Sequence, residues 1–388
     1  MAVPLPDDKT VLLTAPDAAE TTVLARGVVA AVSPGSGLSP LQQTLLTATF
    51  KSMTGHEVDM VATAASLAAD PLGAEGFAHA LARRNLAFRG RIVQIMVLAE
   101  LILDPLPPDV AKRVAEFAAE LNVHDDLEEA VHAFAGSGRQ LACVDFDRNG
   151  YLHDFDPTRT GQLHLVSTLT EAWSAAEHDP RLAARWASMA DLPADTLGRG
   201  VHDFYRSRGF AFPGSPGSAP PLLAQHDWVH VLADYGTRVE SEIEVFAFIA
   251  RANDDLHAFS LLAMVVSLFE TGALAGGAGL FEADRGHLSQ SGMAVRLADA
   301  MRRGALCEGS TDFMALDWFE LADRPVRVLR DELALPPKAE TAVGAGSVGP
   351  WDAGGISPYQ LAAGRRLAEA QGLDYQTPET RKPAEESN

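Results

Sequence analysis

The sequence is poor in cysteine, in aromatic residues and in basic residues. It has only 2 cysteines among 388 residues, which excludes a disulfide scaffold and a cysteine-rich zinc module and fits a reducing cytoplasm. Lys and Arg number 31 against 52 Asp and Glu, so the formal net charge is -21. An acidic chain without a local basic patch is unsuited to the phosphate backbone. We therefore expect no nucleic-acid partner.

Long hydrophobic runs are absent as well. The longest largely apolar stretch, Phe259 to Phe269, is much shorter than the roughly 20 residues of a membrane-spanning helix. It fits a buried core helix or a wall that contacts a lipid, and both interpretations remain open. The N-terminus, MAVPLPDD, has neither the basic region nor the apolar region of a signal peptide. We expect a cytoplasmic protein.

The spacing of apolar residues predicts an all-α fold. Aromatic residues make up only 7% of the chain, and its many alanines favour helix. One helix begins at Ser39, which can cap it, followed by Pro40 at the first helical position and by Gln42, which completes a capping box. Further helices are expected over residues 91–103, 108–122, 125–134, 165–177, 180–190, 196–207, 222–233, 239–252, 256–271, 286–303 and 313–333.

Shifts in composition divide the chain into five parts, and its length allows two to three domains. The parts are an N-terminal arm (1–38), a helical bundle domain (39–137), a connector (138–164), a second helical domain (165–336) and a disordered tail (337–388). The tail is assigned to disorder because it is rich in glycine, proline and charge, with one short helix expected over residues 361–370.

The connector contains a segment that two motifs fit. Residues 143–152 alternate apolar and polar side chains around an Asn-Gly pair, which is a strong β-hairpin signal. Asp145, Asp147 and Asn149 also occupy positions one, three and five of a calcium-binding loop. Position twelve is Asp156, where that loop has a bidentate glutamate, and no entering helix is predicted. The hairpin is the favoured interpretation, and calcium binding is the alternative.

The residues with the clearest chemistry lie in the second helical domain. His226 and His230 are four residues apart, so on a helix both imidazoles can face one ion. Asp227 can add an oxygen ligand or orient a histidine. Glu242 would lie about 18 Å from His230 along one continuous helix. A break at Gly236 lets a second helix fold back, and Glu242 can then reach the same ion.

We therefore predict a divalent metal cofactor. Two neutral nitrogens with carboxylate oxygens suit zinc, and they also suit iron, cobalt or manganese. The competing interpretation is a chance histidine pair on a helix surface.

This segment resembles the ubiquinone (coenzyme Q) biosynthesis protein Coq-four family. The family signature is His-Asp-x-x-His, eleven intervening residues and then Glu. Here His226-Asp227-x-x-His230 is followed by the spacer 231–241 and by Glu242 on register. The flanking pieces around residues 192–198 and 317–333 are similar too. The resemblance covers roughly residues 165–336.

The resemblance implies an all-helical domain in which the four predicted ligands hold a zinc-like ion. It implies a role in ubiquinone biosynthesis, either as a metal-dependent catalyst of oxidative decarboxylation at ring carbon one of a prenylated aromatic acid or as a non-catalytic scaffold. The implied partners are a prenylated quinone precursor or other lipid, other quinone-biosynthesis enzymes, the inner face of the membrane and a second copy in a homodimer. The stretch from Phe259 to Phe269 would then hold the prenyl tail.

A third interpretation is a His-Asp phosphohydrolase. Such sites add a separate upstream histidine and a downstream aspartate to the His-Asp doublet. His202 with Asp254 or Asp255 could supply them, but this scheme leaves Glu242 unexplained.

Overall fold

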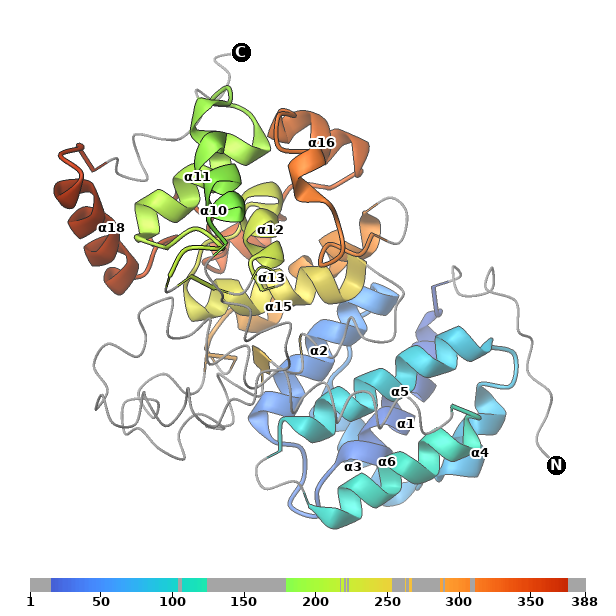
Figure 1. Cartoon of the computed structure of the whole chain (residues 1–388). Coiled ribbons are helices and arrows are strands. Elements are labelled where there is room, and N and C mark those ends of the chain that lie inside the picture. Colours follow the sequence, from blue (N-terminus) through green and yellow to red (C-terminus); the bar gives the residue numbers. More distant parts are fainter. Residues whose placement is uncertain are drawn as a thin grey trace.

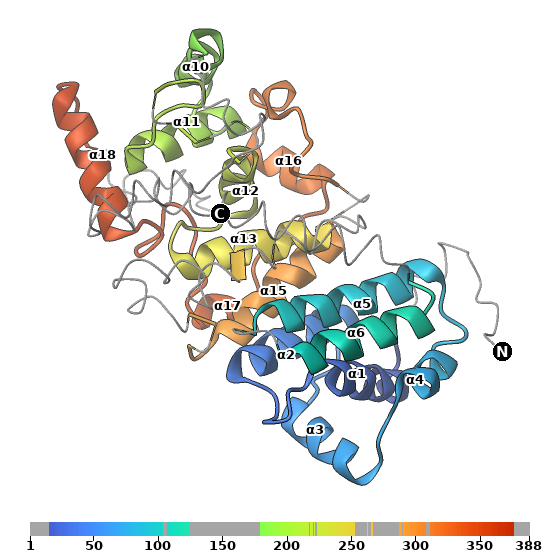
Figure 2. The same cartoon turned by 60° about the horizontal axis from the view of Figure 1, so that its bottom comes forward.

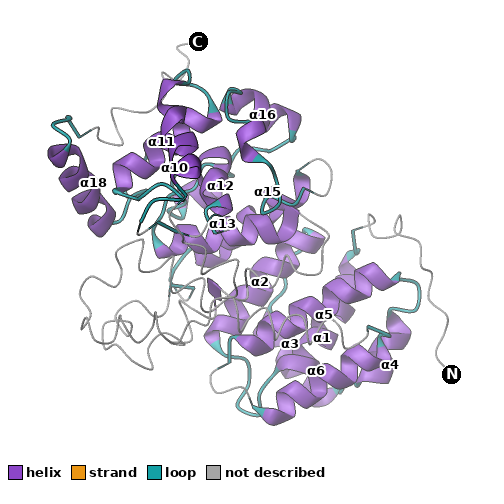
Figure 3. Ribbon diagram, in the orientation of Figure 1, coloured by secondary structure: helices purple, strands orange, loops and turns teal. Residues whose placement is uncertain are grey.

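The computed structural model describes residues 15–103, 107–123, 179–252, 287–307 and 311–375, without Gly217, Pro220, Leu222 and Ser289 and with the addition of Leu262, Val265 and Val266. Every regular element in these residues is a helix (Figure 3), which confirms the predicted all-α fold. None of these helices has the length and apolar character needed to cross a bilayer.

The N-terminal part is a helical bundle (Figure 1). Its helices are α1 (Ala18–Val32), α2 (Pro40–Thr54), α3 (Met60–Ala69), α4 (Ala74–Ala80), α5 (Leu86–Leu101) and α6 (Pro108–Glu120). Helix α2 starts with the predicted capping box, in which Ser39 and Gln42 exchange hydrogen bonds. The Gln42 amide also donates to the carbonyls of Val32, at 2.9 Å, and Ala99, at 3.1 Å. This buried side chain therefore ties α2 to the end of α1 and to α5.

The N-terminal arm predicted for residues 1–38 is wrong for residues 18–32, which form α1. Asp17 caps this helix by accepting from the Glu20 backbone N–H at 2.8 Å, and the helix is buried among α3, α4, α5 and α6. Gly27 lies where the aromatic ring of Phe77 packs against the α1 backbone, because a Cβ there would come within 2.1 Å of the ring. This glycine allows close packing between helices and does not end the helix.

The second part contains the predicted metal-binding residues. Its elements are α10 (Pro180–Ser188), α11 (Leu197–Arg208), α12 (Gln225–Ala233), α13 (Val239–Ala252), α15 (Met293–Leu306), α16 (Val326–Glu332), α17 (Glu340–Gly344), α18 (Pro358–Ala370) and two 3-10 turns at Met189–Asp191 and Trp318–Glu320. The single helix predicted over residues 313–333 is wrong, because the chain turns there and α16 begins only after Pro325. Helix α15 packs against both α13 and α2, so it joins the two parts (Figure 2).

The disorder predicted for residues 337–388 is wrong for residues 337–375, although the one short helix predicted there, over residues 361–370, is confirmed within α18 (Pro358–Ala370). This stretch forms α17 and α18, and α18 lies beside α11 (Figure 1). It buries Ala342, Ile356 and Gln360. Its docking depends on backbone hydrogen bonds and close glycine contacts, which a low apolar content does not reveal. The described helical structure therefore continues beyond residue 336, where the second domain was predicted to end.

Several predictions lie outside the described residues. These are the hairpin predicted over residues 143–152, the alternative calcium loop at residues 145–156, and the helices predicted over residues 125–134 and 165–177. The apolar stretch is described only at Leu262, Val265 and Val266, and all three side chains are buried.

Candidate metal centre

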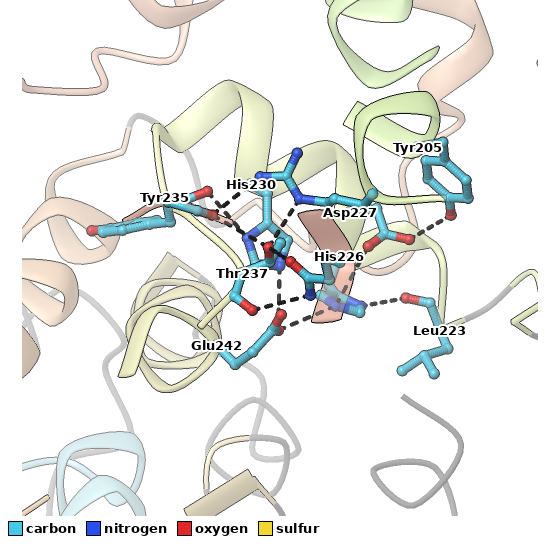
Figure 4. Close-up of polar contacts among 11 residues, drawn as sticks. Tyr205, Leu223, His226, Asp227, His230, Tyr235, Thr237 and Glu242 are labelled. Carbon is cyan, nitrogen blue, oxygen red and sulfur yellow. Dashed lines mark hydrogen bonds and ion pairs between the residues drawn. The ribbon is translucent and has the colours of Figure 1, made fainter. Parts of the chain in front are cut away.

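Two consecutive helices bring the four predicted ligands together. Helix α12 carries His226, Asp227 and His230, and it ends at Asp234, whose backbone is left-handed with φ of 64°. Helix α13 then runs back and presents Glu242 from its first turn (Figure 4). The chain therefore turns back after α12, as we expected from the break at Gly236.

The distances between the ligand atoms suit a shared cation. Glu242 Oε2 lies 3.5 Å from His226 Nε2 and 3.3 Å from His230 Nε2. Asp227 Oδ1 lies 3.7 Å from His226 Nε2. One atom each from His226, Asp227 and His230 falls within 4.8 Å of the others. A tetrahedral ion with bonds of about 2.1 Å has ligand–ligand edges of about 3.4 Å, so this cluster could hold a metal ion.

Hydrogen bonds on the far side of each ring fix the histidine tautomers. His226 Nδ1 lies 2.5 Å from the Leu223 carbonyl oxygen, and His230 Nδ1 lies 3.3 Å from the Tyr235 carbonyl oxygen. Because a carbonyl only accepts, we assign the proton to Nδ1 in both rings. Each Nε2 then presents its lone pair towards Glu242, which is the arrangement that metal-binding histidines adopt.

Asp227 is held by a residue that sequence reasoning missed. The Tyr205 hydroxyl, on α11, donates to Asp227 Oδ2 at 2.5 Å. Asp227 Oδ1 is the oxygen that faces His226. Tyr205 precedes Asp227 by 22 residues and sits at an apolar-face position of its helix, so the sequence offered no signal for this contact. The tyrosine acts by orienting the carboxylate.

The site is closed to solvent and its charges are not balanced by hydrogen bonds. The exposed fraction is 0% for His226, Asp227 and His230 and 1% for Glu242. Within the part of the chain that the structure describes, neither Glu242 oxygen nor His230 Nε2 makes a hydrogen bond. Two acceptors that face each other in a buried site are costly unless a cation lies between them. The residues present therefore fit a divalent ion.

Electrostatics keep the Glu242 carboxyl ionised. Burial by itself raises the pKa of Glu242. Positive charge on the neighbouring imidazoles of His230 and His226 outweighs burial and holds the pKa of Glu242 well below its usual range. When both rings are neutral, a cation bound between them supplies the same positive charge. An ionised carboxylate is the form that binds metal.

The two glutamates that flank Glu242 face other partners. Glu240 Oε1 lies 2.8 Å from His287 Nδ1, and Glu244 Oε2 lies 2.6 Å from Arg296 Nη2. Only the middle of the three glutamates contacts the histidine pair.

The upstream histidine of the phosphohydrolase interpretation, His202, pairs with its neighbour on α11. His202 Nδ1 lies 2.8 Å from Asp203 Oδ1, and both residues are on α11. Asp254 and Asp255 lie outside the described residues.

Aromatic side chains enclose one side of the centre. Trp228, between the ligands on α12, stacks on Trp318 with ring centroids 5.8 Å apart and planes within 4°. Trp186 packs between Tyr205 and Trp228, at centroid distances of 4.9 and 5.4 Å. These rings exclude water from the side of the cluster on which Tyr205 holds Asp227.

No protein-family model and no curated protein matches this chain. The similarity to the Coq-four family thus stays a prediction from the motif and its spacing.

Proposed function

We propose that this chain is a divalent-metal protein whose ligands are His226, Asp227, His230 and Glu242. The observation that carries the proposal is the buried Glu242 carboxylate, which faces the Nε2 atoms of both histidines without accepting a hydrogen bond from the described residues. Zinc is the favoured ion because histidine nitrogens and carboxylate oxygens are its usual ligands, and three of the ligand–ligand separations, 3.3, 3.5 and 3.7 Å, lie close to the edges of a tetrahedron with bonds of zinc length. Iron, cobalt and manganese bind the same types of ligand.

The motif supports a role in ubiquinone biosynthesis, with a prenylated aromatic acid as substrate. A bound ion would supply Lewis-acid stabilisation of the negative charge that develops as carbon dioxide leaves ring carbon one. Replacing the carboxyl group with a hydroxyl group is a two-electron oxidation of the ring. With water as the source of the hydroxyl oxygen and dioxygen as the acceptor of the two electrons, the products are the hydroxylated ring, carbon dioxide and hydrogen peroxide. In this chain Tyr205 orients Asp227, and the carbonyls of Leu223 and Tyr235 orient the two imidazoles.

A structural ion in a non-catalytic scaffold is the second candidate. The observation that favours it is the burial of all four ligands to an exposed fraction of 1% or less. A structural zinc has four protein ligands, whereas a catalytic zinc keeps a position for water or substrate. In this case the protein would bind a quinone precursor and present it to other biosynthetic enzymes.

The first test is metal binding by the full-length chain. Elemental analysis after mild dialysis should give close to one equivalent of a divalent metal per chain. A metal-free protein that also fails to bind added Zn²⁺, Co²⁺, Mn²⁺ or Fe²⁺ would refute the proposal.

Glu242→Gln tests the carboxylate itself. Glutamine keeps the size and loses the charge, so metal affinity should fall by at least the ~10-fold to 100-fold typical of losing an outer-shell partner. Glu240→Gln is the matched control, because Glu240 pairs with His287, and it should keep the metal. Glu244→Gln is a poorer control, since it would leave the buried Arg296 without its carboxylate. Equal metal affinity in the wild type and Glu242→Gln would remove Glu242 from the ligand set.

Catalysis and scaffolding are separated by a second assay. Metal-loaded protein is incubated with a prenylated hydroxybenzoate and dioxygen, and release of carbon dioxide is followed. Turnover that disappears with the metal supports the enzyme. Stoichiometric binding of the prenylated acid without turnover supports the scaffold.

A further inference from the structure

The turn between α12 and α13, residues 234–238, sets the geometry of two ligands. Its Tyr235 carbonyl accepts from His230 Nδ1 at 3.3 Å. Its Arg238 carbonyl accepts the Glu242 backbone N–H at 2.9 Å, in the first turn of α13. A displacement of this turn would therefore move His230 and Glu242 relative to each other.

A segment more than 100 residues later in the chain packs on this turn. We call residues 346–360 the C-terminal strap. The Gly236 N–H donates to the Val348 carbonyl at 2.9 Å, and the Thr237 N–H donates to the Gly355 carbonyl at 2.8 Å. These bonds join the backbone of the strap to the backbone of the turn.

The contact is too close for side chains at two positions. A Cβ on Gly236 would lie 2.7 Å from the backbone of Gly355. A Cβ on Gly349, in the strap, would lie 2.2 Å from Asp234 Oδ1. Gly236 is needed for the strap to sit against the turn, because its neighbour there is backbone that cannot rotate away. A side chain at position 349 would force the Asp234 carboxylate to move.

Three buried polar side chains hold the strap in place. The Gln360 amide donates to the Thr237 carbonyl at 3.3 Å, and its oxygen accepts from the Thr237 hydroxyl. Arg208, on α11, donates from Nε to the Thr237 hydroxyl oxygen at 2.9 Å. Its Nη2 donates to the carbonyls of Pro350, at 2.9 Å, and Gly355, at 3.2 Å. One guanidinium thus binds the turn and the strap together.

We propose that the C-terminal strap is part of the metal centre and that Thr237 and Gln360 are positioning residues for His230 and Glu242. This inference rests on the proposed metal site. Neither residue contacts the ion; each acts through the turn that holds the ligands. Because coupling is reciprocal, an ion bound to the correctly placed ligands also stabilises the docked strap.

The test uses full-length variants and two measurements. Zn²⁺ affinity is measured by competition with a chromophoric chelator, and ligand geometry is measured from the visible absorption of the Co²⁺ protein. Thr237→Val keeps the shape and removes the hydroxyl, so it should weaken Zn²⁺ binding by ~10-fold or more and shift the Co²⁺ bands. Thr237→Ser keeps the hydroxyl, so it should have the wild-type Zn²⁺ affinity and the wild-type Co²⁺ spectrum.

Gln360→Ala should behave like Thr237→Val. The matched control is Gln371→Ala, the same change at an exposed position just after α18, and it should leave affinity and spectrum unchanged. Wild-type affinity and spectrum in both Thr237→Val and Gln360→Ala would overturn the strap inference while leaving the metal site intact. A wild-type chain that binds no metal would overturn the proposed function, and the inference with it.

A measurement on the wild type covers the case in which a variant does not fold. Chymotrypsin can cut the strap after Trp351, and metal should slow this cut relative to protein kept in chelator. Equal cleavage rates with and without bound Zn²⁺ would overturn the coupling.

Discussion

Removing residues 337–388 should destabilise the protein, although their composition is that of a dispensable tail. The truncated chain loses the bonds from the Gly236 and Thr237 backbone N–H groups, the two bonds from Arg208 Nη2, and the two bonds between the side chain of Gln360 and Thr237. Six hydrogen bonds at a net ~0.5–1.5 kcal/mol each contribute roughly 3–9 kcal/mol. This is a large part of the ~5–15 kcal/mol that holds a typical domain folded. The truncation also exposes Arg208, which is fully buried in the intact chain.

The assay compares thermal unfolding of three chains, one ending at Pro336, one ending at Tyr375 and the full length. The chain ending at Tyr375 keeps every contact described above and should unfold with the full-length protein. The chain ending at Pro336 should show a midpoint lower by at least about 5 °C. A midpoint for the shortest chain that equals the full-length value would refute the view that the strap stabilises the fold.

Three further predictions concern single side chains. Tyr205→Phe removes the hydroxyl that holds Asp227 and should lower metal affinity by ~10-fold, as measured by chelator competition; an unchanged affinity would show that Asp227 needs no support. Burial raises the pKa of the Cys307 thiol to about 11. In a Cys143→Ser background, the rate at which iodoacetamide alkylates Cys307 should therefore keep rising up to that pH. A rate that levels off near pH 9 would contradict the raised pKa. Gly27→Ala forces a methyl group against an aromatic ring in the bundle and should cost about 1–3 kcal/mol in denaturant unfolding, and a neutral result would mean that the ring moves aside freely.

The sequence predicted elements whose signals are local. The capping box at Ser39 and Gln42 places the start of α2 within a residue. Helix α13 has the predicted bounds, Val239–Ala252. The spacing between His230 and Glu242, with a break between them, was enough to predict that the two side chains meet. Each of these signals involves residues that are close together in the sequence, so a single sequence is enough to predict the structure that they form.

Elements of the fold that depend on contacts with residues far along the chain could not be predicted from the sequence. Residues 1–38 mix proline, aspartate, glycine and short apolar runs, which favours an irregular arm. The ring that packs on α1 at Gly27 comes from Phe77 in α4, far along the chain. The strap was assigned to disorder because its stability comes from backbone pairing with Gly236 and Thr237 and from one arginine on α11. Composition measures how much apolar surface a segment can bury, and it does not register contacts of this kind.

Helix α15 constrains the order in which the chain can fold during synthesis. It packs on α2 on one side and on α13, which carries Glu242, on the other. Met293, where α15 begins, follows the end of α2 at Thr54 by 239 residues. At ~5–20 residues per second, a ribosome needs roughly 10–50 s to cover that distance. The side of α2 that contacts α15 therefore cannot be covered by that helix until long after α2 has been synthesised.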